Sequence, residues 1–250
     1  MKIRPADTEE IGMKKENILG IDVCVTPKDE LIERVKADIR NARQRFIVAI
    51  NPEKIVKARS DKDLMDVLNS ADYQIPDGVG LVIASRLRGG RIRQRITGID
   101  TMETLCAEAS RCGFRVFLYG ARPEVVEKAK AVLEERYPGI SIVGFVDGYC
   151  ENNDRVVEEI NASGADIVFV ALGSPKQEFW IAGNRKALNA RVLQGVGGSF
   201  DVICGRVKRA PAIMRRCGLE WLYRLVREPK RLFRQLNIVK FLFIIGRKNK

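Results

Sequence analysis

The sequence predicts an α/β fold: a Rossmann-like, mostly parallel sheet with helices on both faces, followed by a basic helical appendage at the C-terminus. Short continuous apolar runs, of which residues 166–172 form the clearest, are typical of strands buried on both faces. These runs alternate with segments whose apolar residues recur at helical spacing, which is the order expected of a parallel sheet. Charge predicts the appendage, because residues 206–250 carry 14 Lys and Arg but 2 Asp and Glu, whereas the charges of the preceding residues balance.

The chain of 250 residues is long enough for one sizeable domain with an attached segment. We expect a flexible leader at residues 1–16, the main α/β domain at residues 17–205 and the appendage at residues 206–250. The leader lacks the apolar run of a signal peptide. The longest apolar window, residues 238–245, contains Lys240 and is far shorter than the ~20 residues that span a bilayer. We therefore expect a cytoplasmic protein.

The expected elements follow one another along the chain in a strand–helix order. A short strand or hairpin at residues 18–25 precedes a helix that Pro27 opens. Further strands are expected at residues 46–50, 115–119, 140–146, 166–172 and within 192–200. Helices are expected around residues 64–68, 79–87, 100–109, 123–133 and 156–160, and after residue 174.

The amino-acid composition limits the chemistry that the protein can perform. The chain has no histidine, so a general base must be a carboxylate, a lysine, a tyrosine or a cysteine. None of the six cysteines forms a C-x-x-C pair, which excludes the usual zinc sites, and we expect reduced, mostly buried thiols. Asp61 and Asp63 form a D-x-D string that could hold a metal-bound nucleotide, but capping of a helix by Asp61 or Ser60 explains it better. We expect neither a metal nor a cofactor.

Asp77 is the candidate general base. It lies between Pro76 and Gly78, after a short apolar segment and before an apolar helix. Backbone amides converge at such a strand-to-helix turn, and a ligand can approach it. Capping of the following helix is the alternative role for this aspartate.

Arg95 is the candidate diphosphate contact, because its guanidinium stands beside Thr97 and Gly98 at the expected start of a helix. A solvated basic loop is the alternative, and it fits Arg88 and Arg91 in the same cluster.

Other candidate ligand contacts lie where strands end, since open α/β sheets bind ligands at that edge. Asn51 follows one expected strand and Gly120 another. After residues 166–172, Ser174 as N-cap and Gln177 three residues later form a capping box, whose helix amides could bind a phosphate or sugar oxygen. The glycines in two turns permit close approach of a ligand: Gly173, Gly195 and Gly197.

The appendage combines positive charge with an apolar stripe. One helical face carries Leu232, Leu236, Val239 and Phe243, with Arg231 and Arg234 beside it. Such a helix can lie in a membrane interface, where each arginine adds ~1 kcal/mol near anionic headgroups. The alternative is that this face packs against the body, or against another subunit in a homo-oligomer. Nucleic acid is disfavoured as a partner, because the charge gathers at one end beside apolar residues.

These motifs together resemble the WecG/TagA/CpsF family of bacterial glycosyltransferases, from about residue 17 to 240. The matching motifs are Asn-Pro-Glu at 51–53, Pro-Asp-Gly at 76–78, Arg-Ile-Thr-Gly at 95–98, Gly-Ser-Pro-Lys-Gln-Glu at 173–178, Gly-Val-Gly at 195–197, Arg-Ala-Pro at 209–211, Gly-Leu-Glu-Trp-Leu-Tyr-Arg at 218–224 and Arg-Glu-Pro at 227–229. No single motif is decisive, but their order and spacing are specific.

The resemblance implies an inverting, metal-independent enzyme. It would move N-acetylmannosamine from a UDP-sugar donor to the 4-hydroxyl of N-acetylglucosamine on undecaprenyl diphosphate, the linkage unit of wall teichoic acid. Asp77 would be the base, Arg95 and Gln177 would line the site, and Gly78 and Glu178 belong to the matched motifs. The basic appendage would close the site at the inner face of the cytoplasmic membrane through Arg224, Arg231 and Arg234.

The sequence departs from the family pattern at one position, and two other functions are alternatives to the one that the resemblance implies. Ala49 stands where many members have a threonine, so we expect a hydroxyl contact to the substrate to be missing here. A relative could use another donor, such as UDP-N-acetylmannosaminuronic acid or UDP-glucose. A Rossmann-type NAD-dependent oxidoreductase is the rival at the level of the fold, disfavoured because no G-x-G-x-x-G follows the first strand.

Overall fold

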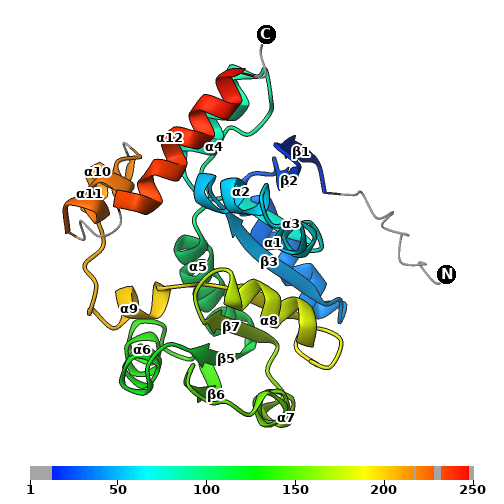
Figure 1. Ribbon diagram of the computed structural model, residues 1–250. Helices are drawn as coiled ribbons and strands as arrows, with labels where there is room; N and C mark the ends of the chain where they lie inside the picture. Colours follow the sequence, from blue (N-terminus) through cyan, green and yellow to red (C-terminus); the bar gives the residue numbers. More distant parts are fainter. Residues whose placement is uncertain (1–12, 217, 228–231, 248–250) are drawn as a thin grey trace, which may run out of the picture.

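Six parallel strands form the sheet that organises the protein (Figure 1), as the sequence predicted. The computed structural model describes residues 13–216, 218–227 and 232–247. The strand order is β4-β3-β8-β7-β5-β6, and every neighbouring pair is parallel. The strands are β3 (Arg45–Ile50), β4 (Tyr73–Pro76), β5 (Arg115–Gly120), β6 (Ser141–Val146), β7 (Ile167–Ala171) and β8 (Val192–Gly195). Because all six run the same way, the loops after them gather at one edge of the sheet.

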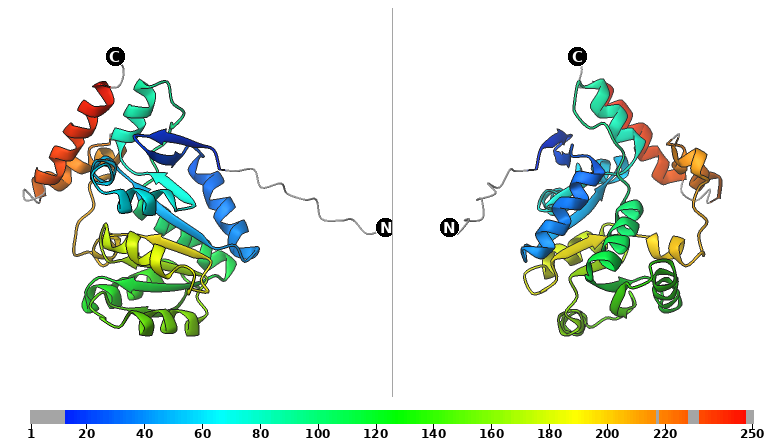
Figure 2. Two further views of the ribbon diagram at one scale, coloured as in Figure 1. Left: turned by 45° about the vertical axis from the view of Figure 1, so that its right-hand side comes forward. Right: turned by 180° about the vertical axis from the view of Figure 1, so that it is seen from behind.

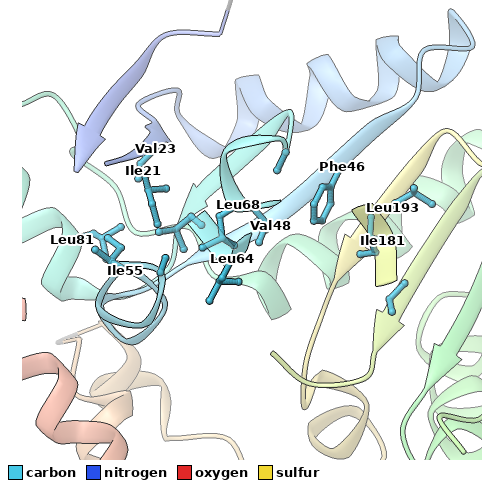
Figure 3. Close-up of a cluster of buried hydrophobic side chains, with 14 of the residues drawn as sticks. Ile21, Val23, Phe46, Val48, Ile55, Leu64, Leu68, Leu81, Ile181 and Leu193 are labelled. Carbon is cyan, nitrogen blue, oxygen red and sulfur yellow. The ribbon is translucent and has the colours of Figure 1, made fainter. Parts of the chain in front are cut away.

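Helices cover both faces of the sheet, because the strands bury side chains on both sides. In β3, Phe46 and Val48 point into one core (Figure 3), whereas Ile47 belongs to the other. The first core is covered by α2 (Pro52–Ala58), α3 (Lys62–Asn69), α4 (Val79–Leu87), α7 (Asn153–Ser163) and α8 (Lys176–Asn184). The second is covered by α1 (Lys28–Arg40), α5 (Gly98–Cys112), α6 (Pro123–Arg136) and α9 (Ser199–Ile203).

Side-chain caps explain where several of these helices begin. Asp61 accepts a hydrogen bond from the Leu64 N–H at 2.9 Å, which confirms capping as the role of this aspartate in the D-x-D string. Thr97 caps α5 in the same way, accepting from the Asp100 N–H at 3.1 Å. Sequence reasoning missed α2, although an Asn cap followed by proline signals a helix start.

The capping box expected at Ser174 and Gln177 was wrong. The helix α8 begins at Lys176, its N-cap is Pro175, and no side chain caps it. The Gln177 carboxamide is used elsewhere, since its oxygen accepts a hydrogen bond from the Gly197 N–H at 2.9 Å.

The N-terminal part of the described chain is a hairpin of β1 (Lys15–Ile18) and β2 (Ile21–Cys24). Residues 1–12 of the expected leader lie outside the described residues, whereas Lys15 and Glu16 already belong to β1. The Glu16 carboxylate accepts hydrogen bonds from the Ser85 hydroxyl at 2.8 Å and the Arg91 N–H at 2.6 Å. The hairpin thereby fixes the end of α4 and the basic turn after it.

The appendage contains α10 (Ala212–Arg216), α11 (Glu220–Arg227) and α12 (Leu232–Arg247). Helix α12 lies beside α4 (Figures 1 and 2) and against α2. It buries Phe241 and Ile245 in the core of the body, whereas Leu242 and Phe243 are 41% and 59% exposed. Packing on the body therefore accounts for part of the apolar surface of this helix. The side chains of Leu232, Leu236 and Val239 from the expected stripe lie outside the described residues.

The cysteines in the described chain are thiols rather than disulfides, and three of the five are buried: Cys24, Cys106 and Cys204. Burial raises the pKa of the Cys24 thiol to about 11 and that of Cys106 further. Among the helices that the structure describes, none combines the length and the apolar character needed to cross a bilayer.

Candidate active site

Asp77 lies directly after β4, at the carboxyl edge of the sheet. Its N–H donates to the Ile50 carbonyl at 2.7 Å, which ties the residue to the end of β3. Its Oδ2 accepts from the Gly98 N–H, the first residue of α5, at 3.4 Å, and its Oδ1 lies 3.9 Å from Arg95 Nε. The positive end of a helix and a guanidinium therefore both face this carboxylate. The N-cap of α4 is Gly78 and no side chain caps that helix, so capping does not explain Asp77.

A cavity of about 360 Å³ opens above Asp77, and we call it the Asp77 cavity. It contains five of the residues expected in the site, together with residues of α4, α11 and α12. The five are Asn51, Asp77, Gly78, Arg95 and Thr97. The side chain of Asp77 is 30% exposed, so it can meet a ligand there. The turn requires a glycine after Asp77, because Gly78 has a φ of +118°.

Arg95 is held in place by the appendage. Its Nη2 donates to Glu220 Oε2 at 2.5 Å and its Nη1 to the Arg215 carbonyl at 3.3 Å. Glu220 is only 5% exposed, so this charge-assisted pair is shielded from water. The appendage thus supplies one wall of the Asp77 cavity and the main partner of its cation. Sequence reasoning gave Glu220 no role, although it belongs to the matched motif at residues 218–224.

Gln177 and Glu178 belong to a buried network behind the site. Glu178 is fully buried, and its Oε1 accepts from Lys54 Nζ at 2.7 Å and from Gln177 Nε2 at 2.9 Å. Lys54 Nζ also donates to the Ala49 carbonyl at 2.8 Å. The network joins the end of β3, the start of α8 and the turn after β8. Glu178 is placed to orient Gln177 rather than to meet a ligand itself.

The glycines expected in the site have different structural roles. A Cβ on Gly195 would lie 2.6 Å from Gln177 Nε2, and one on Gly120 would lie 2.6 Å from the Ala171 backbone. Both glycines therefore serve close packing inside the protein. Gly173 and Gly197 have φ values of +77° and +53°, as their turns require. Ser174, next to Gly173, is exposed.

A second cleft, of about 550 Å³, lies at the other half of the same edge, and we call it the β5–β7 cleft. Its walls carry three exposed cations: Arg122 just before α6, Lys176 at the start of α8 and Arg206 after α9. Tyr149, 67% exposed, and Asp201 complete the polar lining. Sequence reasoning gave none of these five a binding role, although Lys176 belongs to the matched motif at residues 173–178, because nothing in their spacing along the chain links them.

Two further expectations concern residues around the Asp77 cavity. Ala49 is close to the site, since a Cβ on Gly98 would meet the Ala49 Cβ at 3.3 Å. Ala49, which replaces the threonine of many family members, therefore lies next to Gly98, whose N–H donates to Asp77. Arg231 lies outside the described residues, as do the side chains of Arg224 in α11 and Arg234 in α12.

Comparison with known proteins identifies the family. Residues 16–250 match the family described as "Glycosyl transferase WecG/TagA/CpsF family". The chain is 41% identical over 204 residues to the N-acetylglucosaminyldiphosphoundecaprenol N-acetyl-beta-D-mannosaminyltransferase of Bacillus subtilis (strain 168), covering 82% of this chain and 80% of the relative. A protein of the same name from Bacillus spizizenii is 43% identical over 197 residues, 79% of this chain and 77% of the relative. With a match over nearly its whole length, this chain belongs to the WecG/TagA/CpsF family of glycosyl transferases.

Proposed function

We propose that this enzyme moves N-acetylmannosamine from UDP-N-acetylmannosamine to the 4-hydroxyl of N-acetylglucosamine on undecaprenyl diphosphate. The product carries a β-1,4 bond and serves as the linkage unit of wall teichoic acid. The names of the two Bacillus relatives support the donor sugar and the lipid-linked acceptor. The observation that carries the proposal is the position of Asp77 in a cavity between the sheet edge and the appendage.

Asp77 acts as the general base in this reaction. Its carboxylate takes the proton of the acceptor hydroxyl as the hydroxyl oxygen attacks the anomeric carbon of the donor. The bond between that carbon and the diphosphate oxygen breaks, and UDP leaves with the electron pair. A single displacement of this kind inverts the configuration at the anomeric carbon. Arg95 and the N-terminus of α5 stabilise negative charge near the reacting atoms.

The β5–β7 cleft suits the nucleotide part of the donor. Arg122, Lys176 and Arg206 can contact the diphosphate, the Tyr149 ring can stack on the base, and the Asp201 carboxylate can accept from a base N–H. The strand order places β8, with Gln177 and the turn at Gly197, between this cleft and the Asp77 cavity. The donor sugar would bridge the two across that turn.

The location that we propose is the inner surface of the cytoplasmic membrane. Large apolar side chains of α10 and α11 are exposed, among them Ile213 at 76%, Val226 at 74% and Leu222 at 37%. Apolar residues flanked by cations suit a monotopic contact with anionic lipid. Flotation with liposomes of increasing phosphatidylglycerol content measures this contact, and equal recovery with neutral liposomes would argue against the role of charge.

The proposal is tested with the full chain, a panel of UDP-sugars and N-acetylglucosaminyl-diphosphate lipid in liposomes. We expect transfer from UDP-N-acetylmannosamine, detected by mass spectrometry, and a β-1,4 linkage by NMR. If transfer occurs from UDP-glucose or UDP-N-acetylmannosaminuronic acid instead, the proposed donor is wrong. If UDP is released without any lipid-linked product, the proposed acceptor is wrong.

A further inference from the structure

The walls of the Asp77 cavity differ in chemistry from its floor. The floor lies at the sheet edge and is polar, with Asp77 and Arg95. The walls come from α2, α4, α11 and α12. Their charged residues, Glu53 and Glu220, lie at the starts of α2 and α11, and the other wall residues are mostly apolar, with Ile83, Trp221 and Leu242 among them. A cavity whose polar groups gather at one end suits a ligand whose polar and apolar parts are joined end to end.

Helix α4 gives this cavity a direction. It begins two residues after Asp77 and lies beside α12 (Figures 1 and 2). At a rise of about 1.5 Å per residue, Ile83 lies about 6 Å further along the helix than Val79, and Leu87 about 12 Å further. The part of the Asp77 cavity that is lined by Val79 and Ile83 of α4 and by Ile238 and Leu242 of α12 therefore leads away from the carboxylate. We call this part the α4–α12 groove.

Exposed apolar side chains line the α4–α12 groove. Ile83 is 43% exposed and Leu242 41%, and Leu87, 64% exposed, follows Ile83 along α4 by about one helical turn. Exposed apolar side chains that gather around one groove mark a binding surface. Arg88 and Arg91, both exposed, follow directly after Leu87. Exposed cations at the end of a helix with exposed apolar side chains complement an anionic membrane surface, from which a lipid chain can enter the groove.

We propose that the α4–α12 groove binds the isoprene units next to the diphosphate of a polyprenyl diphosphate acceptor, between Ile83 and Leu242. The inference rests on the proposed function, because that function supplies a lipid-linked acceptor. A cavity of about 360 Å³ holds only the first units of such a chain, and the remainder stays in the bilayer. Contacts on both sides of the diphosphate fix the acceptor hydroxyl relative to Asp77, which a membrane surface alone does not do.

Direct binding provides the first test, because Trp221 lines the cavity. The chain has two tryptophans, so Trp180→Phe leaves Trp221 as the only reporter of fluorescence. Farnesyl diphosphate is titrated without membranes, and inorganic diphosphate is added as a competitor. We expect farnesyl diphosphate to bind at least tenfold more tightly than inorganic diphosphate. Ile83→Ser and Leu242→Ser should each weaken farnesyl diphosphate binding about tenfold, the usual effect of removing apolar contacts from a pocket, and leave inorganic diphosphate unchanged.

Phe145→Ser is the matched control, because Phe145 is 40% exposed but lies on β6, at the opposite end of the sheet from β4. It should retain the full preference for farnesyl diphosphate. Equal affinity of the unmodified groove for both ligands, or loss of the preference in Phe145→Ser as well, would overturn the inference.

Kinetics provides the second test and separates the inference from the proposed function. The groove variants should lose about tenfold in kcat/KM with a farnesyl-linked acceptor, and little with a methyl-linked acceptor of the same sugar diphosphate. Equal losses on both acceptors would refute the groove. A protein that prefers farnesyl diphosphate but transfers no sugar to any acceptor would refute the proposed function and retain the groove.

Discussion

The Asp77 cavity and the β5–β7 cleft lie at the same edge of the sheet but hold their charges differently. In the Asp77 cavity, the side chain of Arg95 is 20% exposed and bonds to the nearly buried Glu220. In the β5–β7 cleft, Arg206 is 44% exposed and lies 3.7 Å from Asp201. Charges fixed before the substrate arrives suit the chemical step. Exposed, adaptable charges suit capture of a ligand from solution. Substitutions in the cavity should therefore change kcat, and those in the cleft should change donor affinity.

The largest effect is expected from Asp77→Asn. The amide cannot accept the proton of the acceptor hydroxyl, so kcat should fall by about 10²–10⁴-fold, the usual contribution of a general base. The dissociation constant for UDP, measured by calorimetry, should stay within about twofold, or ~0.4 kcal/mol, because the site that we propose for UDP is the other cleft. Turnover close to that of the unsubstituted enzyme would remove Asp77 from the mechanism.

The next effect concerns the link between the appendage and the cavity. Glu220→Gln keeps the shape but removes the charge that holds Arg95. A hydrogen bond to a charged group contributes about 1.5–3 kcal/mol, so we expect kcat/KM for the acceptor to fall about 10–100-fold.

Glu220→Asp is the matched control, because it keeps the charge and should recover part of the activity. UDP affinity should not change in either variant. If UDP affinity fell as much as turnover, the Asp77 cavity and the β5–β7 cleft would not act independently.

Sequence reasoning predicted the two halves of this comparison unequally. Asp77 lies in one turn and Arg95 and Thr97 in another, and proline, glycine and a helix cap mark these turns. Their meeting in one cavity follows from local signals and from the parallel sheet. Glu220 follows Arg95 by 125 residues, and no spacing rule connects them. The β5–β7 cleft was missed for the same reason, since its cations come from separate parts of the chain.

The error at Gln177 shows how a long-range contact overrides a local pattern. Its spacing from Ser174 fits a capping box, but its carboxamide oxygen accepts from Gly197, 20 residues further along the chain. The strands were predictable because continuous apolar runs bury both faces, as the five buried residues of β7 do. In α12, Phe241 is buried in the core whereas Phe243 is exposed, because the helix packs against α2. The spacing of apolar residues along the helix does not indicate which side will pack against the body.

A smaller effect is expected in the β5–β7 cleft. Arg206→Ala should weaken UDP binding about fivefold, because an exposed charge pair contributes up to about 1 kcal/mol. The kcat value at saturating donor should not change. The effect should shrink in high salt, because exposed charges are screened. Arg43→Ala, an exposed arginine before β3 at the opposite edge of the sheet, is the control. Equal losses in both variants would indicate a general effect of net charge.

The smallest effect concerns the segment between Arg206, which lines the β5–β7 cleft, and Arg215, which contacts Arg95 at the Asp77 cavity. We call it the connecting segment. Arg209 donates to Asp100 in the first turn of α5 and to Glu103 at 3.3 Å, which pins this segment to the body. Burial alone would raise the pKa of Asp100, but hydrogen bonds from Thr97 and Arg209 lower it below its ordinary value. The pair therefore stabilises the fold above the pKa of the unfolded chain, about 3.9 for aspartate, and the stabilisation is lost as the pH falls through the lower pKa of the folded state.

Asp100→Asn should accordingly reduce the free energy of unfolding by about 1 kcal/mol at pH 7, a value kept low because the Asp100 side chain is partly exposed. The difference from the unsubstituted protein should close as the pH falls below about 3.9, where the aspartate of the unfolded chain is protonated. Urea denaturation between neutral and acid pH measures this difference. Asp154→Asn is the matched control, because Asp154 is exposed in the first turn of α7. If both variants lose the same stability at every pH, the effect belongs to helix starts in general, and the contact between Arg209 and Asp100 does not hold the connecting segment in place.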